Sequence, residues 1–94
     1  KVSAEQALEW GLVNRVASPE SLDDEVDKVV AYYKNAPTKA IALMKSMLQQ
    51  SGNLSLDQVL ELEAEAQEVA GLSEDYKEGV AAFKEKRRAK FTGK

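Results

Sequence analysis

The sequence predicts an all-α fold of four to five helices with one short extended segment near the N-terminus. Apolar residues recur at helical spacing through most of the 94 residues, and pairs of Ser and Gln three positions apart mark helix starts. A chain of this length is one small domain or a piece of a larger one. Its 44% hydrophobic and 31% charged content is typical of a globular chain rather than a disordered or membrane-spanning one.

The first helix is expected to begin after Ser3, because Ser3 and Gln6 have the spacing of a capping box. It should end at Gly11, since glycine tolerates the left-handed backbone that closes many helices. The next segment, Leu12–Val16, is too short for a helix and contains two β-branched residues. We therefore expect a brief extended segment there.

Two further helices are expected on either side of Pro37. Ser18 and Pro19 mark the start of the first, because proline suits the opening position of a helix. The residue before Pro37 disfavours helical backbone, so this helix ends there and the next begins at or near Pro37. That helix should stop in the segment Ser51–Asn53. Its predicted inner face carries five apolar residues: Ala40, Ile41, Met44, Met47 and Leu48.

The last two helices are also bounded by start and stop residues. A second capping box, Ser55–Gln58, opens the fourth helix, and Gly71 is its expected C-cap. Either Ser73 or Asp75 caps the final helix, with Asp75 and Glu78 at capping-box spacing. The final helix is expected to be amphipathic and to lead into a basic tail.

The side-chain chemistry of the chain is narrow, because it contains neither Cys nor His. Disulfides, thiol nucleophiles, Ser-His-Asp arrangements and the common zinc ligand sets are therefore excluded. Glu61, Glu65 and Glu68 lie one or two turns apart on one helix, as an acid–base pair or a carboxylate metal site would require. Helical di-metal sites also use His, so the pattern favours a solvated acidic face and no metal.

The last eighteen residues, Lys77–Lys94, are the most distinctive part of the sequence. They contain seven Lys or Arg residues against two Glu, a local charge of +5, and the helical spacing of apolar positions extends loosely to Arg87. The whole chain has a net charge of −3 and a pI near 5.0, so duplex nucleic acid is a poorly supported partner. A small phosphorylated ligand fits better, with Phe83 stacking on a base. Basic residues that merely favour the helix dipole explain the composition about equally well.

Two segments resemble the crotonase (enoyl-CoA hydratase/isomerase) superfamily. They are Ser3–Val16 (SAEQALEWGLVNRV) and Ser73–Gly93 (SEDYKEGVAAFKEKRRAKFTG), and Lys45 and Glu63 also stand at positions that suit the family. The resemblance covers essentially the whole chain, in order and at family spacing. The stretch Leu62–Gly79 is most similar to isomerases of the phenylacetate pathway that act on ring-epoxide phenylacetyl-CoA, although hydratases of fatty acid metabolism share most of it.

The resemblance implies a division of labour within a larger enzyme. Residues 1–17 would be the last helix and strand of a β/α spiral core, and residues 18–94 a C-terminal helical oligomerisation module of a trimer or hexamer. In the family, two backbone N–H groups stabilise a thioester enolate and acidic side chains move protons. Those groups belong to the core, so the resemblance implies no catalytic residue in this chain, no activity of the chain alone and no cofactor bound by it alone. Its partners would be the upstream core, other copies of the chain and the acyl-CoA substrate.

The resemblance also implies one ligand contact. In enoyl-CoA hydratases the last helix lends an aromatic and a lysine to the adenine and phosphate end of CoA in a neighbouring subunit, and Phe83 and Lys86 match those positions. Packing between subunits is an equally good explanation of Phe83. No signal peptide or transmembrane segment is visible, and we expect a cytoplasmic protein with no membrane or nucleic-acid partner. The alternative is a stand-alone helical module that binds another protein and catalyses nothing.

Overall fold

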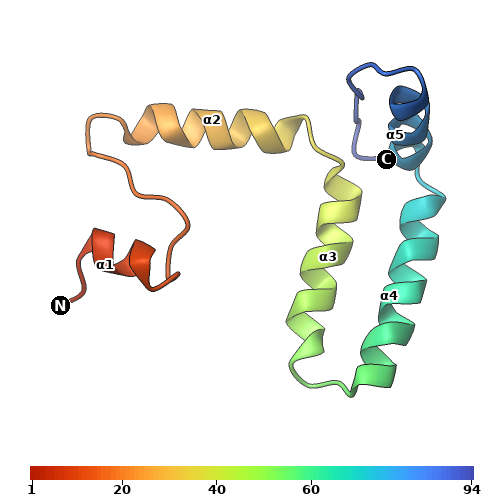
Figure 1. Cartoon of the computed structure of the whole chain (residues 1–94), viewed down its shortest axis with the longest axis horizontal. Coiled ribbons are helices and arrows are strands. Elements are labelled where there is room, and N and C mark those ends of the chain that lie inside the picture. Colours follow the sequence, from red (N-terminus) through yellow and green to blue (C-terminus); the bar gives the residue numbers. More distant parts are fainter. The chain divides into compact units, whose positions relative to one another are not determined.

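The computed structural model describes all 94 residues and contains five α helices and no strand (Figure 1). The prediction of an all-α chain is therefore confirmed. The chain divides into two compact units, Lys1–Ala31 and Tyr32–Lys94, which are described separately below. The helices are α1 (Ala4–Glu9), α2 (Leu22–Lys34), α3 (Thr38–Ser51), α4 (Leu56–Gly71) and α5 (Glu74–Lys84). None of them is long and apolar enough to cross a membrane.

Helix α1 has the capping box and the glycine end that the sequence predicts. The Gln6 N–H donates to the Ser3 Oγ at 3.2 Å, and the Ser3 N–H donates to the Gln6 side chain at 3.0 Å. At the other end Gly11 has φ +72°, and the N–H of Leu12 donates to the Ala7 carbonyl at 2.8 Å. These features define a Schellman motif, in which a left-handed residue satisfies carbonyls that the helix leaves open.

The rest of the first unit differs in detail from expectation. Residues 12–16 lie outside the helices, as predicted, but they form no strand because the chain offers no strand to pair with them. Helix α2 begins at Leu22 rather than at Pro19. The reason is local: the N–H of Ser21 donates to the Ser18 carbonyl at 3.1 Å, which closes a separate turn before the helix.

The second unit is built on an antiparallel helical hairpin, α3–α4, with α5 following directly (Figure 1). Helix α3 ends at the predicted place, with Gly52 as its C-cap, and Ser55 forms the predicted capping box with Gln58. Gly71 is not the C-cap of α4, however; it is the last helical residue, and Leu72 follows in right-handed geometry. No left-handed residue is needed because Ser73 starts the next cap at once.

Helix α5 is capped by Ser73 and not by Asp75. The Ser73 Oγ accepts from the Tyr76 N–H at 3.0 Å and donates to the Ala70 carbonyl at 2.6 Å, so one hydroxyl joins the end of α4 to the start of α5. The helix stops at Lys84, short of Arg87. The chain then turns back and runs alongside α5 to its C-terminus (Figure 1).

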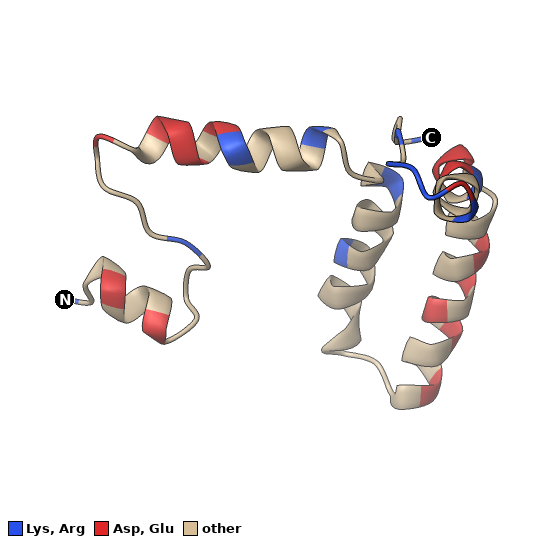
Figure 2. Ribbon diagram, turned by 45° about the horizontal axis from the view of Figure 1, so that its top comes forward, with Lys and Arg blue, Asp and Glu red and all other residues tan.

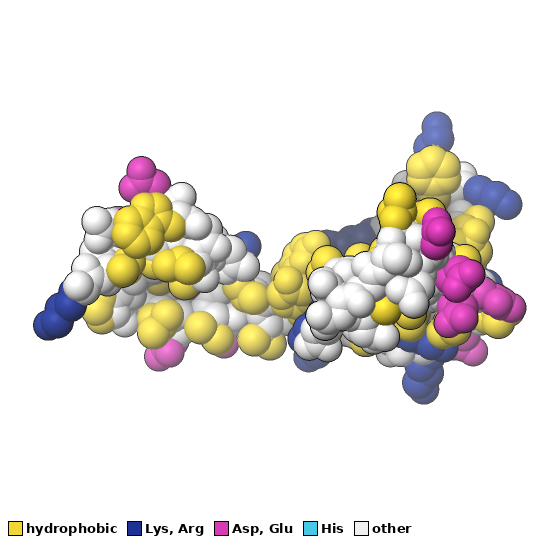
Figure 3. Space-filling model, turned by 90° about the horizontal axis from the view of Figure 1, so that it is seen from below, with side chains coloured by type: hydrophobic (Ala, Val, Ile, Leu, Met, Phe, Trp, Pro, Cys, Tyr) yellow, Lys and Arg dark blue, Asp and Glu magenta, His cyan; other side chains and the backbone are white.

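Few side chains of this protein are buried. Ala82 is the one buried apolar residue, and hydrophobic side chains remain at the surface of both units (Figure 3). Two residues of the predicted inner face of α3, Met44 and Leu48, are 53% and 76% exposed. Met44 still borders the space between α3 and α4, but for Leu48 the prediction is wrong, because α4 covers only one side of α3. Such extensive apolar exposure is characteristic of a surface that another protein segment covers.

Candidate functional site

The end of α5 brings the two predicted CoA-contact residues together. Phe83 is 86% exposed, and the N–H of Lys86 donates to the Phe83 carbonyl at 3.2 Å. The N–H of Arg87 donates to the Ala82 carbonyl at 3.0 Å, which completes a second Schellman motif. Lys86 takes the left-handed position of this motif with φ +53°, the only non-glycine residue in the chain with positive φ. Glycine usually fills that position because it has no Cβ to clash.

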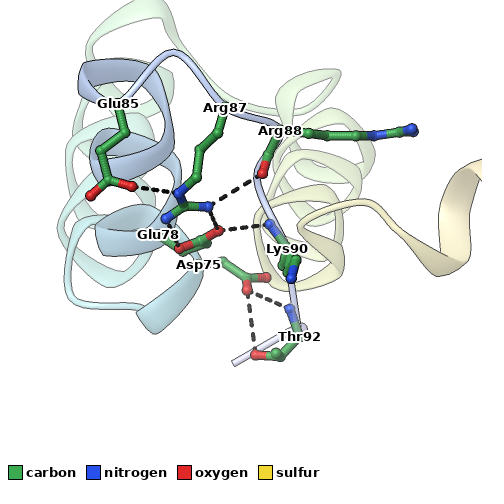
Figure 4. Close-up of polar contacts among 7 residues, drawn as sticks. All are labelled: Asp75, Glu78, Glu85, Arg87, Arg88, Lys90 and Thr92. Carbon is green, nitrogen blue, oxygen red and sulfur yellow. Dashed lines mark hydrogen bonds and ion pairs between the residues drawn. The ribbon is translucent and has the colours of Figure 1, made fainter.

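After this turn, residues 87–94 form what we call the C-terminal strap, which is tied to α5 at two places. The first tie is Glu78, whose carboxylate receives a two-pronged contact from Arg87, at 2.6 Å and 2.9 Å (Figure 4). The same carboxylate accepts the backbone N–H of Lys90 at 2.8 Å. Arg87 also donates through Nε to Glu85 at 2.5 Å. Bidentate contacts between an arginine and a carboxylate are among the strongest hydrogen-bonded contacts in proteins.

The ionisation of this cluster follows from its hydrogen bonds. The side-chain hydrogen bonds from Arg87, aided by the Lys90 N–H, lower the pKa of Glu78 to about 2. The hydrogen bonds to Glu78 and then Glu85 raise the pKa of Arg87. Both groups are therefore charged at neutral pH, and the charge of Arg87 is already paired. Of the basic residues counted in the sequence, Arg87 is not available to an anionic ligand.

The second tie is Asp75, which is only 4% exposed. Its carboxylate accepts the N–H groups of Thr92 at 2.6 Å and Gly93 at 2.9 Å, while its own N–H donates to the Lys94 carbonyl at 3.0 Å. Of the two predicted caps, Ser73 is the one that forms, and the capping-box spacing of Asp75 and Glu78 serves the strap instead. Their spacing one turn apart on a helix, followed by a tail with four basic residues at positions 87–94, was the signal that could have identified them as anchors.

Apolar and steric contacts complete the strap. The ring of Phe91 lies over Gly79, close enough that a Cβ at this glycine would be 3.6 Å from a ring carbon. Gly93 has φ +80°, and a Cβ there would be 2.5 Å from the Thr38 hydroxyl at the start of α3. The strap therefore reaches from the end of α5 to the beginning of α3.

Five basic side chains at the end of α5 and in the strap make no ion pair: Lys84, Lys86, Arg88, Lys90 and Lys94. The side chain of Arg88 points away from the Glu78 cluster, and the basic residues follow the tail in Figure 2. Of these residues, Lys84 lines an apolar groove of about 480 Å³ formed by residues of α3, α4, α5 and the strap, with Phe83 also in its wall. Cations without an ion pair can bind phosphate, and an exposed aromatic ring can stack on a base.

No comparable chemistry occurs on the acidic helix. Glu61, Glu65 and Glu68 lie along α4, which Figure 2 shows as a run of acidic residues. No group of three or more carboxylates is arranged to hold a metal ion. The end of α5 combines an exposed aromatic side chain, a left-handed lysine and a fixed turn.

Comparison with known proteins identifies the family. The model of the enoyl-CoA hydratase/isomerase family matches residues 1–94. The chain belongs to this family. It is 40% identical over 94 residues to the 1,2-epoxyphenylacetyl-CoA isomerase of Escherichia coli K12, covering all of this chain and 36% of the relative. It is 34% identical over 93 residues to the crotonyl-CoA hydratase of Syntrophomonas wolfei, with 99% and 36% covered.

Solved structures of family members have the same fold. An enoyl-CoA hydratase subunit from Geobacillus kaustophilus HTA426 superposes with a TM-score of 0.89 at 38% identity, over 98% of this chain and 36% of that one. An enoyl-CoA hydratase from Mycobacterium marinum gives 0.86 at 31% identity, over 99% and 37%. The chain therefore spans a little over a third of the length of the family members it matches. The recognition of the family and of its all-helical segment is confirmed.

Proposed function

We propose that this chain is the C-terminal helical part of an enzyme that acts on acyl-CoA thioesters through a stabilised enolate. Its own part is assembly with other subunits and contact with the nucleotide end of CoA, and the catalytic groups lie elsewhere in the enzyme. The observation that carries the proposal is Lys86, a lysine held with φ +53° three residues after an exposed phenylalanine, Phe83.

The left-handed backbone of Lys86 argues against a purely structural role for this residue. A non-glycine residue in left-handed geometry costs about 1–2 kcal/mol, and glycine at the same place would cost little. The Lys86 side chain makes no ion pair that offsets this cost, and it is exposed. Non-glycine residues in unfavourable backbone regions cluster at binding and catalytic sites. A lysine here therefore serves a ligand better than it serves the fold.

Phe83 supplies the second half of the contact. With 86% of its surface exposed it gains little from packing within this chain, and an aromatic face is suited to stacking on adenine. Packing against a neighbouring subunit would use the same exposure. The apolar residues left open on the hairpin, such as Leu48 and Leu56, support the assembly role, because obligate interfaces resemble a domain core divided in two.

Both named relatives act on CoA esters, which supports CoA as the common part of the substrate. A second candidate is a carrier-protein thioester, because the chain is also 40% identical over 93 residues to the trans-2-decenoyl-[acyl-carrier-protein] isomerase of Streptococcus mutans. In that case the unpaired basic residues would contact the carrier protein rather than a nucleotide. Measuring kcat/KM with one acyl group on CoA and on a carrier protein distinguishes the two.

The test of the CoA contact is Lys86→Ala in the full-length enzyme. We expect KM for the CoA ester to rise roughly 5- to 10-fold with kcat unchanged, because the lost contact is equally strong in the ground state and the transition state. Lys77→Ala is the matched control, since Lys77 is an exposed lysine on α5, the helix that precedes Lys86, and has no ion pair. An unchanged KM in Lys86→Ala would remove this residue from the CoA site.

The isolated chain provides a second test. We expect no turnover of crotonyl-CoA by residues 1–94 alone, because the proposal locates the catalytic groups elsewhere. The stand-alone module predicts a monomer that unfolds cooperatively, whereas a part of a larger enzyme associates or melts readily. Sedimentation and a thermal melt separate these outcomes, and measurable turnover by the chain would overturn the division of labour.

A further inference from the structure

We propose that Glu78 and Arg87 are positioning residues that hold Lys86 in its ligand-binding conformation, so that affinity for CoA depends on an ion pair that never touches the ligand. This inference rests on the proposed function, because it takes Lys86 as the residue that meets the CoA phosphates. It adds the cause of the lysine's position to the contact itself.

The two residues that flank Lys86 are engaged in one network. Arg87 donates to both oxygens of Glu78, at 2.6 Å and 2.9 Å, and its Nε donates to Glu85 at 2.5 Å. The backbone is thus held immediately before and immediately after Lys86. The lysine side chain has no ionic partner of its own. The network fixes the main chain of Lys86 and leaves its amine free.

Glu78 also determines the path of the strap. Besides Arg87 it accepts the N–H of Lys90 at 2.8 Å, so one carboxylate holds two points of the basic half of the strap (Figure 4). Asp75 holds the far end through Thr92 and Gly93. Because the anchors are separate, loss of Glu78 frees the segment around Lys86 while the end of the strap stays attached.

The left-handed backbone of Lys86 is the element that the network restrains. The two backbone hydrogen bonds of the Schellman motif hold Lys86 at φ +53°, and the Glu78–Arg87 ion pair, here called the clamp, adds to them against the return to negative φ that an L-residue prefers. That change redirects its side chain and the chain after it. The clamp itself is partly exposed, with 24% of the Glu78 side chain and 39% of the Arg87 side chain accessible, and ion pairs of this exposure stabilise a fold only modestly. Its principal effect is therefore on geometry.

The experiment uses the full-length enzyme and CoA as the probe. Titration calorimetry gives the Kd for CoA, and a thermal melt without CoA reports on folding. We expect Glu78→Gln to weaken CoA binding 3- to 10-fold with a small change in melting temperature. Glu74→Gln is the matched control, because it removes the same charge from an exposed position of the same helix that has no ionic partner. Equal Kd values for Glu78→Gln and the unmodified enzyme would overturn the inference.

A double-mutant cycle distinguishes positioning from general damage. If Glu78 acts through Lys86, then Glu78→Gln has no further effect on the Kd once Lys86→Ala is present. Full additivity overturns the positioning role and leaves the CoA contact of Lys86 standing. If Lys86→Ala alone leaves the Kd unchanged, the proposed CoA contact itself is wrong.

Arg87→Lys is the second variant, in case Glu78→Gln impairs folding. It keeps the positive charge but replaces the planar fork, so one hydrogen bond to Glu78 remains possible instead of two. We expect its CoA affinity to lie between that of the unmodified enzyme and that of Arg87→Gln. An Arg87→Lys affinity equal to that of Arg87→Gln at an unchanged melting temperature would support the need for the fork. Affinities equal to that of the unmodified enzyme in both variants would overturn the inference.

Discussion

The α3–α4 hairpin and the α5–strap region are held together in opposite ways. The hairpin carries large apolar residues and leaves several of them open, with Leu48 76% and Leu56 73% exposed. All three buried residues of the chain lie in the other region: Ser73, Asp75 and Ala82. There, carboxylates of one helix bind backbone N–H groups of the strap, and few apolar contacts are needed.

This difference separates a region whose polar contacts are made within the chain from one whose apolar surface is left open. The carboxylates of Asp75 and Glu78 accept hydrogen bonds from groups of the same chain. No buried side-chain polar atom lacks a partner. The strap can therefore form before assembly. Covering the apolar residues on the open side of the hairpin would stabilise the folded protein by about 25 cal/mol per Å² of buried apolar area. The strap is fixed by contacts within the chain, whereas the hairpin leaves large apolar side chains exposed.

The largest expected effect comes from the buried anchor of the strap. Asp75→Asn replaces an acceptor that serves two N–H groups with an amide that presents a donor to one of them. We expect the strap to open more easily by about 2–3 kcal/mol, because hydrogen bonds to a buried charge are the costly ones to lose. Hydrogen exchange at the Thr92 and Gly93 amides measures it. Glu74→Gln is the control, and equal protection in the two variants would mean that Asp75 is not the anchor.

The second effect concerns the close approach of the strap to α3. Gly93→Ala should destabilise the strap by about 1–2 kcal/mol, since alanine is strained at φ +80° and its Cβ would lie 2.5 Å from the Thr38 hydroxyl. In the Gly93→Ala background, Thr38→Ala removes the clashing hydroxyl. It should restore the stability lost to the clash but not the stability lost to backbone strain. Chemical denaturation of the single and double variants measures both. Strict additivity of the two substitutions would show that the strap does not meet Thr38.

The third effect is the acid dependence of the exposed anchor. Arg87 and the Lys90 N–H lower the pKa of Glu78 from 4.5 to about 2. A group with a lowered folded-state pKa contributes its full stabilisation above the unfolded value, near pH 4.5, and loses it as the pH falls toward 2. The strap should therefore stay attached at pH 4. An NMR titration of the Glu78 carboxyl carbon gives the midpoint, and a midpoint near 4.5 would mean that the ion pair does not form in solution.

The helix boundaries show which features of the structure can be predicted from short-range sequence patterns. Ser3 and Ser55 were predicted as capping residues and Gly11 as a left-handed end, and each acts over four or five residues. The helices formed by such local signals were found correctly. The family was also recognised, because its signature is a linear string of residues.

The anchors of the strap were missed because they act over longer separations. Asp75 binds groups 17 and 18 residues away, and Glu78 binds Arg87 nine residues away. No local pattern distinguishes a carboxylate that caps its own helix from one that binds a returning chain. The left-handed Lys86 was also unpredictable, since propensity assigns that position to glycine. Its departure from the local rule is what marks it as a candidate for function.

The smallest effect in the chain alone belongs to the open side of the hairpin. Leu48→Gln should change the free energy of unfolding of residues 1–94 by no more than about 0.5 kcal/mol, because exposed positions tolerate substitution. Leu43→Gln is the matched change on the side that faces α4, where Leu43 and Met47 line the space between the helices, and it should cost more than 1 kcal/mol. In the full-length enzyme the order should change, with Leu48→Gln lowering the melting temperature or the oligomeric mass. If Leu48→Gln is neutral in the full-length enzyme as well, nothing covers this face of the hairpin. The hairpin and the strap would then differ in residue composition but not in their need for a partner.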